Sequence, residues 1–340
     1  MSLQRGVSII GWGSTLPNQV VSNQDLEQRV NTSDEWIRTR TGILERRVAE
    51  PTKAASDLAI TASEAALRRA NINARQLDLV IVATVTPDML FPATACLVQD
   101  KLGANRAGAF DLEAGCTGFL YGISVGREFV RTGTYDHVLV VGVDILSRIT
   151  NWEDRNTCVL FGDGAAAVVL GAGPVGEGIL STYLGSDGAG GEFLYVPAGG
   201  SRRPINREAL EQGLQYTHMK GPEVFKFAVR IMAMATLEAL NKAGLGLEDV
   251  DYLIPHQANQ RIIDAASRRL LIPTERVLIN LDRYGNMSSA SIPVALAEAA
   301  DAGRFQPGDV LVLVGFGAGL TWGANVVKWS SGSGLSEKDP

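Results

Sequence analysis

Short apolar runs alternate along the chain with longer segments in which apolar residues recur at helical spacing. The short runs are β-branched and bounded by turn residues, which is typical of buried strands. They lie at 7–10, 79–83, 137–141, 165–170, 252–254 and 310–314. The helical patterns cover 54–70, 94–102, 119–132, 222–243, 260–270 and 292–302. Strands and helices in alternation predict an α/β fold.

The two halves of the chain repeat one pattern. The stretches 77–81, 109–118 and 137–141 resemble, in the same order, 250–254, 279–288 and 309–313. We therefore predict two similar α/β halves, 1–174 and 175–330, divided within the Gly- and Pro-rich stretch 171–178.

Two segments fall outside this repeat. Residues 185–215 are polar and glycine-rich, so we expect a long surface loop or flap there. The Ser- and Gly-rich residues 331–340 are expected to form a disordered tail.

Charge and cysteine content narrow the class of protein. The 340 residues carry 31 Lys and Arg against 37 Asp and Glu, a net charge of −6 that disfavours nucleic acid and anionic membranes as partners. No apolar run reaches the roughly 18–20 residues that a membrane span requires, and residues 1–13 lack a signal-peptide pattern. Only Cys96, Cys116 and Cys158 occur, so we expect reduced thiols and a cytoplasmic location.

Cys116 stands between an apolar strand and a helix, in the segment EAGCTG (113–118). A helix N-terminus at this point is expected to lower the pKa of the thiol and to supply N–H groups for an oxyanion. A lone cysteine, however, is more often an inert core residue. Cys96 and Cys158 lie in helical and strand-like apolar settings, and for both we favour a place in the core.

Two further polar residues lie where α/β proteins build sites. His256 follows a strand end in IPHQAN (254–259), whereas His137 and His218 are interpreted as structural. Asn286 occupies the position in the second half that matches the Cys116 region in the first. Simpler interpretations stay open, because a lone histidine is usually structural and asparagine often ends a turn or caps a helix.

Glycine clusters after strands supply backbone donors. In GFGAG (315–319), the N–H groups that follow a hydrophobic strand are suited to an oxyanion hole. FGDG (161–164) is interpreted as a tight structural turn. Residues 171–176 match G-x-G-x-x-G but lack the strand-to-helix context of a dinucleotide site. The spacing of His and Cys predicts no metal site.

Several longer motifs occur together, in one order, along nearly the whole chain. They are TSDEWI (32–37), TRTGI (39–43), FGDGA (161–165), HQAN (256–259) and GAGLTWG (317–323), together with Cys116, His256 and Asn286. In this combination the chain closely resembles the β-ketoacyl-[acyl-carrier-protein] synthase III family. The resemblance implies a homodimer and a thiolase-like fold, in which two duplicated α/β halves form a layered αβαβα core.

The resemblance also implies an activity, the initiating condensation of type II fatty acid biosynthesis. Cys116 would take an acetyl group from acetyl-CoA; malonyl-acyl-carrier-protein would then be decarboxylated and attack this thioester, giving acetoacetyl-acyl-carrier-protein, CO2 and CoA. His256 and Asn286 would donate hydrogen bonds to the malonyl thioester oxygen, while the N–H groups of Cys116 and Ala318 would hold the other oxyanion. The CoA thioester is a substrate, and neither a cofactor nor a metal is implied.

Family likeness assigns further residues to substrates and partners. Stacking and cationic donors suit the CoA site, which would comprise Thr32, Trp36, Arg40, Arg155 and Asn259. The primer pocket would contain Phe161 and, reaching across the dimer from the other subunit, Phe91. A basic patch for the acidic carrier protein would comprise Lys226, Arg261, Arg268 and Arg269. For this patch a solvated helix face is an equal alternative.

Related activities leave two alternatives open. A thiolase requires a second catalytic cysteine near the C-terminus, and no cysteine follows Cys158. Elongating synthases pair their cysteine with two histidines, whereas the third position here is Asn286. The remaining alternatives are a synthase of secondary metabolism with another acyl primer or acceptor, and a non-catalytic acyl-binding scaffold. The presence of Cys116, His256 and Asn286 together disfavours the scaffold.

Overall fold

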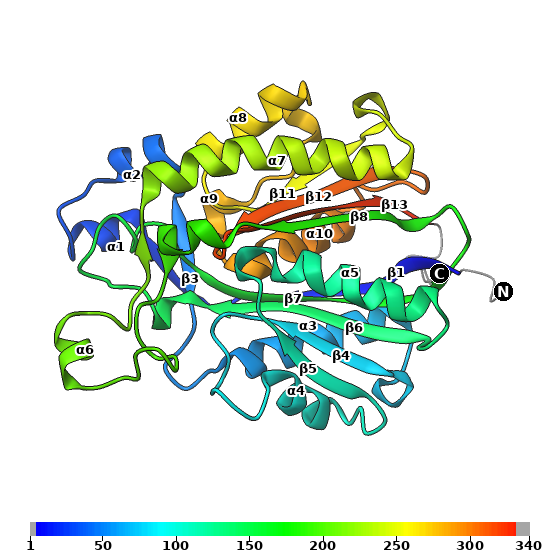
Figure 1. The fold of residues 1–340 in the computed structure, drawn as a ribbon, viewed down its shortest axis with the longest axis horizontal. Coiled ribbons are helices and arrows are strands. Elements are labelled where there is room, and N and C mark those ends of the chain that lie inside the picture. Colours follow the sequence, from blue (N-terminus) through cyan, green and yellow to red (C-terminus); the bar gives the residue numbers. More distant parts are fainter. Residues whose placement is uncertain (1–4, 331–340) are drawn as a thin grey trace.

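The computed structural model describes residues 5–330, and its main strands form one hydrogen-bonded sheet. The strand order is β11-β12-β13-β8-β1-β7-β6-β4-β5. β1 and β8 meet near their starts, at the pair Val7 and Gly178. The strands on either side of this junction lie in two separate layers (Figure 1).

The first layer contains strands from the N-terminal half. They are β1 (Gly6–Thr15), β4 (Leu79–Ala83), β5 (Gly108–Leu112), β6 (His137–Ile145) and β7 (Asp163–Gly173). β4 runs parallel to β5 and β6, and β7 is antiparallel to β6 and β1. β4, β6 and β7 are nearly continuous buried runs because helices cover both faces of this layer.

The second layer repeats the arrangement with strands from the C-terminal half. They are β8 (Gly178–Ser186), β11 (Tyr252–Pro255), β12 (Val310–Gly317) and β13 (Thr321–Lys328). β11 and β12 are parallel, and β13 is antiparallel to β12 and β8. The stretch 171–176 contains the end of β7 and leads to β8, which is a strand, and so it does not have the strand-to-helix context of a dinucleotide site. The boundary between 174 and 175 stays a prediction about domain organisation.

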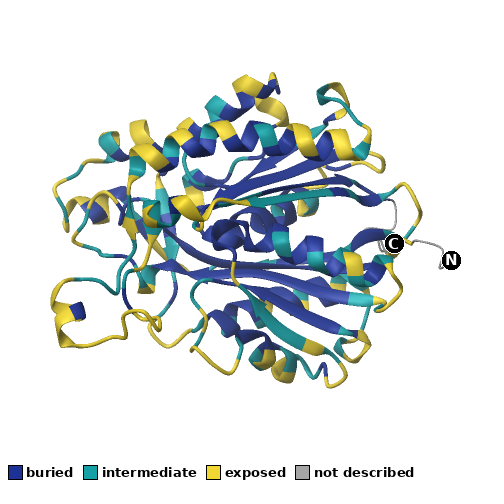
Figure 2. Cartoon of the chain, in the orientation of Figure 1, coloured by how far each residue is buried: buried dark blue, intermediate teal, exposed yellow. Residues whose placement is uncertain are grey.

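Helices fill the space between the layers and cover both outer faces. The outer helices are α3 (Ala55–Ala70) and α4 (Thr94–Leu102) on one side, and α7 (Gly221–Ala243) and α8 (Gln260–Leu270) on the other. Between the layers lie α5 (Gly118–Arg131) and α10 (Ser291–Asp301), both largely buried (Figure 2). Gly122 lets α5 approach β6, since a Cβ there would lie 2.8 Å from Val140 Cγ1. The predicted layered αβαβα core is confirmed.

Shorter elements surround one end of the core. They are β2 (Gln19–Ser22), β3 (Glu45–Val48), α1 (Asn23–Glu27), α2 (Asp34–Thr41), α6 (Arg207–Glu211), α9 (Leu281–Tyr284), β9 (Leu194–Tyr195) and β10 (His218–Met219). The expectation of a plain loop over 185–215 was incomplete, because this segment contains the end of β8, a 3₁₀ segment (Gly188–Phe193), β9 and α6. The predicted tail, 331–340, lies outside the described residues.

Two expectations about cysteines need correction. Cys96 is exposed on α4 and does not belong to the core. Its Sγ lies 3.9 Å from Ala109 O on β5, the last strand of the sheet, and helical spacing alone did not show that this position stays open to solvent. Cys158 is fully buried, as predicted, but it lies in a series of turns before β7 and not in a strand.

Candidate active site

Cys116 occupies a sharp turn between β5 and α5. The turn is a 3₁₀ segment, Gly115–Thr117, and α5 begins at the next residue. Gly115 adopts a φ of 54°, and a Cβ there would lie 2.8 Å from Ala318 N. A glycine is therefore required both by the backbone conformation and by the close approach of the second half of the chain. Cys116 is only 9% exposed, so the surrounding residues enclose it almost completely.

The end of β12 brings two other parts of the site together. Gly315 and Gly317 face the same side of the strand, because alternate residues of a strand share a face. A Cβ at Gly317 would lie 2.5 Å from Cys116 N, and one at Gly315 would lie 3.3 Å from His256 Cβ. The absence of side chains at these two positions makes room for the nucleophile and the histidine side by side.

Backbone donors converge on the sulfur atom. The N–H groups of Cys116 and Ala318 both hydrogen-bond the thiol and favour its ionised form. The same two N–H groups were predicted from the sequence as the oxyanion hole. Because they act at one point beside the nucleophile, they are placed to stabilise negative charge that develops on a bound carbonyl oxygen.

Burial dominates the acidity of the thiol. It raises the pKa of Cys116 to about 11, and the Asp144 carboxylate adds to this increase, whereas the Ser288 hydroxyl and the two N–H groups oppose it. The expectation of a lowered pKa for Cys116 was therefore wrong, although the N–H donors themselves act in the expected direction. Desolvation of the thiolate outweighs the nearby donors.

His256 follows β11 and lies beside the end of β12. Its backbone N donates to Val314 O at 2.8 Å, and its ring is 5.5 Å from that of Phe316. Burial lowers the pKa of His256 to about 3, so the imidazole is neutral near pH 7. Among residues 5–330, its buried Nδ1 has no hydrogen-bond partner. A neutral imidazole can donate one hydrogen bond without adding a charge to the site.

Asn286 is fixed by the segment that precedes β7. Its backbone N donates to Leu160 O at 2.8 Å, and its backbone O accepts from Gly162 N at 2.9 Å. Its side-chain Oδ1 accepts from Ser288 N at 2.8 Å. The prediction of a tight turn at FGDG (161–164) was wrong, because the turns end at Leu160, Phe161 forms an isolated bridge with Asn286, and Asp163 and Gly164 already belong to β7. The start of this segment instead holds the backbone of Asn286, a role that the sequence did not indicate.

Two buried charges near the site were missed by the sequence analysis. Asp144, fully buried at the end of β6, accepts from Val85 N at 2.8 Å and from Ser289 Oγ at 2.7 Å. Arg46, also fully buried, donates to Val159 O at 2.9 Å and so supports the segment that holds Asn286. A charged residue inside the apolar run of β6 was the available signal for Asp144.

The residues predicted for CoA lie together on the surface. The guanidinium groups of Arg40 and Arg155 lie over the Trp36 ring, at 4.8 and 5.0 Å from its centroid. Asn259, which caps α8, donates from Nδ2 to Arg40 O at 3.0 Å and so joins α8 to α2. Thr32 lies just before α2, with a buried Oγ1 that has no partner within residues 5–330.

The remaining predicted residues differ in exposure. Phe161 is 7% exposed beside Asn286, whereas Phe91 is 84% exposed and follows two other exposed apolar residues, Met89 and Leu90. The four basic residues are exposed on α7 and α8, which pack together: Lys226, Arg261, Arg268 and Arg269.

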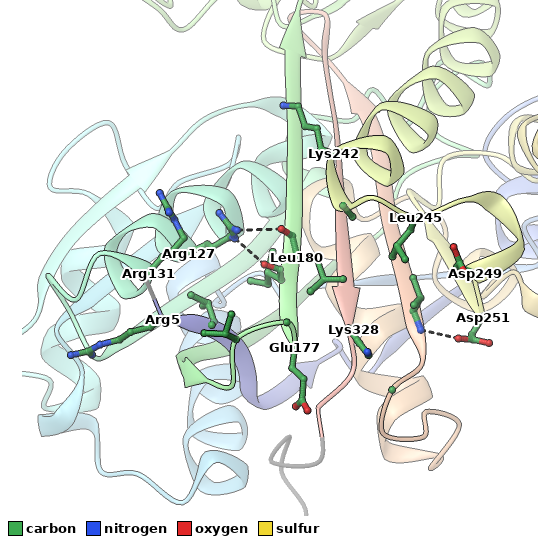
Figure 3. Close-up of a pocket in the computed structure, with 18 residues that line it drawn as sticks. Arg5, Arg127, Arg131, Glu177, Leu180, Lys242, Leu245, Asp249, Asp251 and Lys328 are labelled. Atoms are coloured by element: carbon green, nitrogen blue, oxygen red, sulfur yellow. Dashed lines mark hydrogen bonds between the residues drawn. The ribbon is translucent and has the colours of Figure 1, made fainter. Parts of the chain in front are cut away.

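A large surface cavity of about 670 Å³ lies away from these residues, near the starts of β1 and β8 (Figure 3). Its lining mixes cations and anions, and its arginines already have partners: Arg5 pairs with Asp136 at 2.6 Å, and Arg127 donates to Ile179 O at 2.9 Å. The cavity therefore selects no ligand by charge. Within residues 5–330, no group of three His, Cys, Asp or Glu side chains is placed to bind a metal ion, and no helix has the length and apolarity needed to cross a membrane.

Comparison with known proteins agrees with this geometry. Family models described as 3-oxoacyl-[acyl-carrier-protein] synthase III and its C-terminal part match residues 110–188 and 240–329. The β-ketoacyl-[acyl-carrier-protein] synthase III of Caldanaerobacter subterraneus subsp. tengcongensis is 57% identical over 322 residues, covering 95% of this chain and 97% of that protein. The chain belongs to the β-ketoacyl-[acyl-carrier-protein] synthase III family.

Solved structures extend the likeness to the fold. The synthase III of Thermus thermophilus is 50% identical with a TM-score of 0.88, covering 95% of this chain and 99% of that one. The priming β-ketosynthase of the R1128 polyketide pathway is 35% identical with a TM-score of 0.90, covering 97% of this chain and 98% of that one. This synthase III is an acyltransferase, the initiating condensing enzyme of fatty acid biosynthesis.

Proposed function

We propose that the enzyme condenses acetyl-CoA with malonyl-acyl-carrier-protein to give acetoacetyl-acyl-carrier-protein, CO2 and CoA. The observation that carries the proposal is the convergence of the Cys116 and Ala318 N–H groups on one buried thiol. Two observations support it: His256 is neutral and lies against Gly315 on the strand whose Gly317 contacts Cys116, and the backbone of Asn286 is anchored to residues 160 and 162. The chemistry needs no resident cofactor, since the substrates are thioesters and the loss of CO2 drives carbon–carbon bond formation.

Cys116 performs the first half-reaction. Its sulfur attacks the acetyl carbonyl carbon, and the carbonyl oxygen becomes an oxyanion held by the two N–H groups. Collapse of this intermediate expels the CoA thiolate, which takes up the proton that the Cys116 thiol lost, and leaves an acetyl thioester on Cys116. Because the pKa of the free thiol is about 11, the thiolate becomes accessible only through stabilisation within the substrate complex.

His256 and Asn286 act in the second half-reaction. Their side-chain N–H groups hydrogen-bond the thioester oxygen of the malonyl group, which gains negative charge as CO2 leaves. The resulting enolate carbon attacks the acetyl thioester, and the Cys116 sulfur departs as thiolate. The neutral form of His256 suits this role, because it donates a hydrogen bond without retaining the malonyl carboxylate by charge.

Surface residues hold the carriers of the two acyl groups. Trp36 supplies an aromatic face on which adenine stacks. The guanidinium groups of Arg40 and Arg155, which cover this face in the structure, move off the ring and bind the phosphates of CoA. Asn259 and Thr32 supply polar contacts at the neighbouring ends of α8 and α2. The exposed cations of α7 and α8, namely Lys226, Arg261, Arg268 and Arg269, receive the acidic carrier protein.

The primer pocket is proposed to be completed by dimer formation. Phe161 lines it from within the subunit, next to Asn286. Phe91 is 84% exposed, and an apolar ring so accessible to water favours insertion into the pocket of a second copy. Likeness to the R1128 priming ketosynthase favours one alternative, a synthase that uses the same mechanism with a different acyl primer.

Intact-mass measurement tests the proposal. The protein is incubated in parallel with acetyl-CoA and with longer and branched acyl-CoAs, and peptide mapping locates each adduct. We expect an acetyl adduct on Cys116 that malonyl-acyl-carrier-protein discharges to acetoacetyl product. An adduct formed only from other acyl-CoAs would establish the alternative primer, and the absence of any adduct would refute the proposed acylation.

Variants separate the two half-reactions. Cys116→Ala should abolish acylation, whereas His256→Ala and Asn286→Ala should still become acylated but should not release CO2 from malonyl-acyl-carrier-protein. Condensation that persists in both of the latter variants would contradict their assigned roles. Arg261→Glu should raise the KM for malonyl-acyl-carrier-protein several-fold without changing acylation, and the exposed Arg75→Glu on the opposite half serves as its control.

A further inference from the structure

Two threonine hydroxyls join the turns that carry the backbone donors. Thr117 Oγ1 lies 2.7 Å from Ala114 O and 2.9 Å from Thr321 Oγ1. Thr321 Oγ1 lies 2.9 Å from both Ala114 O and Ala318 O. Thr117 follows the nucleophile, and Thr321 begins β13 just after the turn that contains Ala318. The four groups form a bridge between segments 204 residues apart in the chain.

The contacts within this bridge limit what each hydroxyl can do. Thr117 Oγ1 can donate to Ala114 O or to Thr321 Oγ1, whereas Thr321 Oγ1 can donate to Ala114 O or to Ala318 O. Of the two hydroxyls, the one on Thr321 has a hydrogen bond with Ala318 O. Thr321 is thus the side chain that can hold the carbonyl of Ala318.

Thr321 also fixes the peptide group on the other side of Ala318. Its backbone is paired in register with Gly317 across the antiparallel strands β12 and β13. The Gly317–Ala318 peptide carries the Ala318 N–H, and Gly317 itself is pressed against Cys116 N. With one end of Ala318 held by the strand pairing and the other by the Thr321 hydroxyl, the direction of its N–H is determined.

We propose that Thr321, supported by Thr117, is a positioning residue that aims the Ala318 N–H and the Cys116 N–H at one oxyanion. The inference rests on the proposed function, because it concerns the oxyanion of the acylation step. Thr321 acts through the backbone and does not contact the substrate. Loss of its hydroxyl loosens one donor by a fraction of an ångström, and such misplacement is costly when donors must meet a developing charge.

Isosteric substitution provides the test. Thr321→Val keeps the shape and strand preference but removes the hydroxyl, and Thr321→Ser restores the hydroxyl. Thr236→Val is the control, because Thr236 is fully buried in α7 and its Oγ1 has no partner within residues 5–330. Each protein is tested with acetyl-CoA for the rate and KM of Cys116 acylation, with iodoacetamide for the rate of alkylation, and by thermal unfolding.

The two reactions of the same thiol distinguish positioning from general damage. Alkylation by iodoacetamide forms no oxyanion and depends on the Ala318 N–H only through its minor effect on the ionisation of the thiol, whereas acylation also requires this donor to stabilise the oxyanion. We expect Thr321→Val to lower the acylation rate by roughly ten- to a hundredfold, with KM within twofold and alkylation within threefold of wild type. Thr321→Ser and Thr236→Val should acylate within threefold of wild type.

Several outcomes would overturn the inference. Equal losses of acylation and alkylation in Thr321→Val, unchanged acylation in that variant, or failure of Thr321→Ser to restore the rate would each do so. If Thr321→Val does not fold, Thr117→Val is measured in the same way, and wild-type acylation there overturns the bridge. If the wild-type protein itself forms no acetyl adduct, the proposed function fails, and this inference fails with it.

Discussion

A single methyl group at Gly317 should separate the nucleophile from the end of β12. In Gly317→Ala, the new Cβ would lie 2.5 Å from Cys116 N and 3.1 Å from Cys116 Cβ. Ordinary contacts begin near 3.4 Å, so the two backbones must move apart by about 0.9 Å. Both neighbours are backbone or Cβ atoms, and no flexible side chain can move aside to relieve the contact.

The size of the effect follows from that displacement. Overpacking of this kind costs about 1–3 kcal/mol of unfolding free energy. A displacement of about 1 Å between reacting groups lowers a rate by roughly a hundredfold. We therefore expect Gly317→Ala to fold with moderately reduced stability and to acylate Cys116 about a hundred times more slowly than wild type.

Rapid-quench intact-mass kinetics with acetyl-CoA measure the acylation rate, and urea unfolding measures the stability. Gly221→Ala, at the start of α7, is the matched control, because a Cβ there meets only the flexible end of Met219, at 4.0 Å. Acylation by Gly317→Ala within threefold of the control would refute the reasoning. It would show that the contact between Gly317 and Cys116 does not set the geometry of the site.

Further predictions concern the buried charges and the thiol. The folded-state pKa of Cys116 is raised from 9.0 to about 11, so the rate of alkylation by iodoacetamide should rise about tenfold per pH unit from pH 7 to 10. For the same reason, the contribution of this thiol to stability should be lost as pH rises between 9.0 and about 11. A plateau of the alkylation rate below pH 9 would contradict both expectations. The folded-state pKa of His256 is lowered from 6.5 to about 3, so between these pH values the unfolded chain binds a proton that the folded chain does not. The free energy of unfolding should therefore fall as pH decreases from 6.5 to about 3, and it should fall less steeply in His256→Gln. Equal dependence on pH in the two proteins, measured by urea unfolding, would oppose this. Asp144→Asn should lower the free energy of unfolding by about 2 kcal/mol. One carboxylate oxygen of Asp144 accepts from Thr84 and Val85 and the other accepts from Ser289, so the amide N–H₂ of asparagine leaves one of these sets of donors without an acceptor. An unchanged midpoint in urea unfolding would show that these hydrogen bonds add nothing to stability. Arg46→Met should cost about 3 kcal/mol, because it leaves the acceptors on Val21, Asn23 and Val159 without their donor; a melting temperature equal to that of wild type would argue against this.

Local signals in the sequence located most helices. The predicted ranges 94–102 and 260–270 agree with α4 and α8, because apolar periodicity and end signals such as Gly103 are properties of neighbouring residues. Strands were less complete: β8 and β13 were missed, since many of their residues are polar, small or half-buried. Their place beside each other depends on a pairing between distant segments.

The residues proposed to carry the chemistry, and their order, could be named from the sequence alone: Cys116, His256, Asn286 and the glycine-rich turn at 317–319. Their relative positions and their pKa values follow from the packing of the folded chain. The pKa of Cys116 follows from desolvation by both halves of the chain and is opposite in direction to what its helix position suggested. The bridge between Thr117 and Thr321 joins residues 204 positions apart, and no local pattern encodes such a contact. Periodicity and capping arise from neighbours in the chain, whereas burial and long-range hydrogen bonds exist only once the two layers have packed.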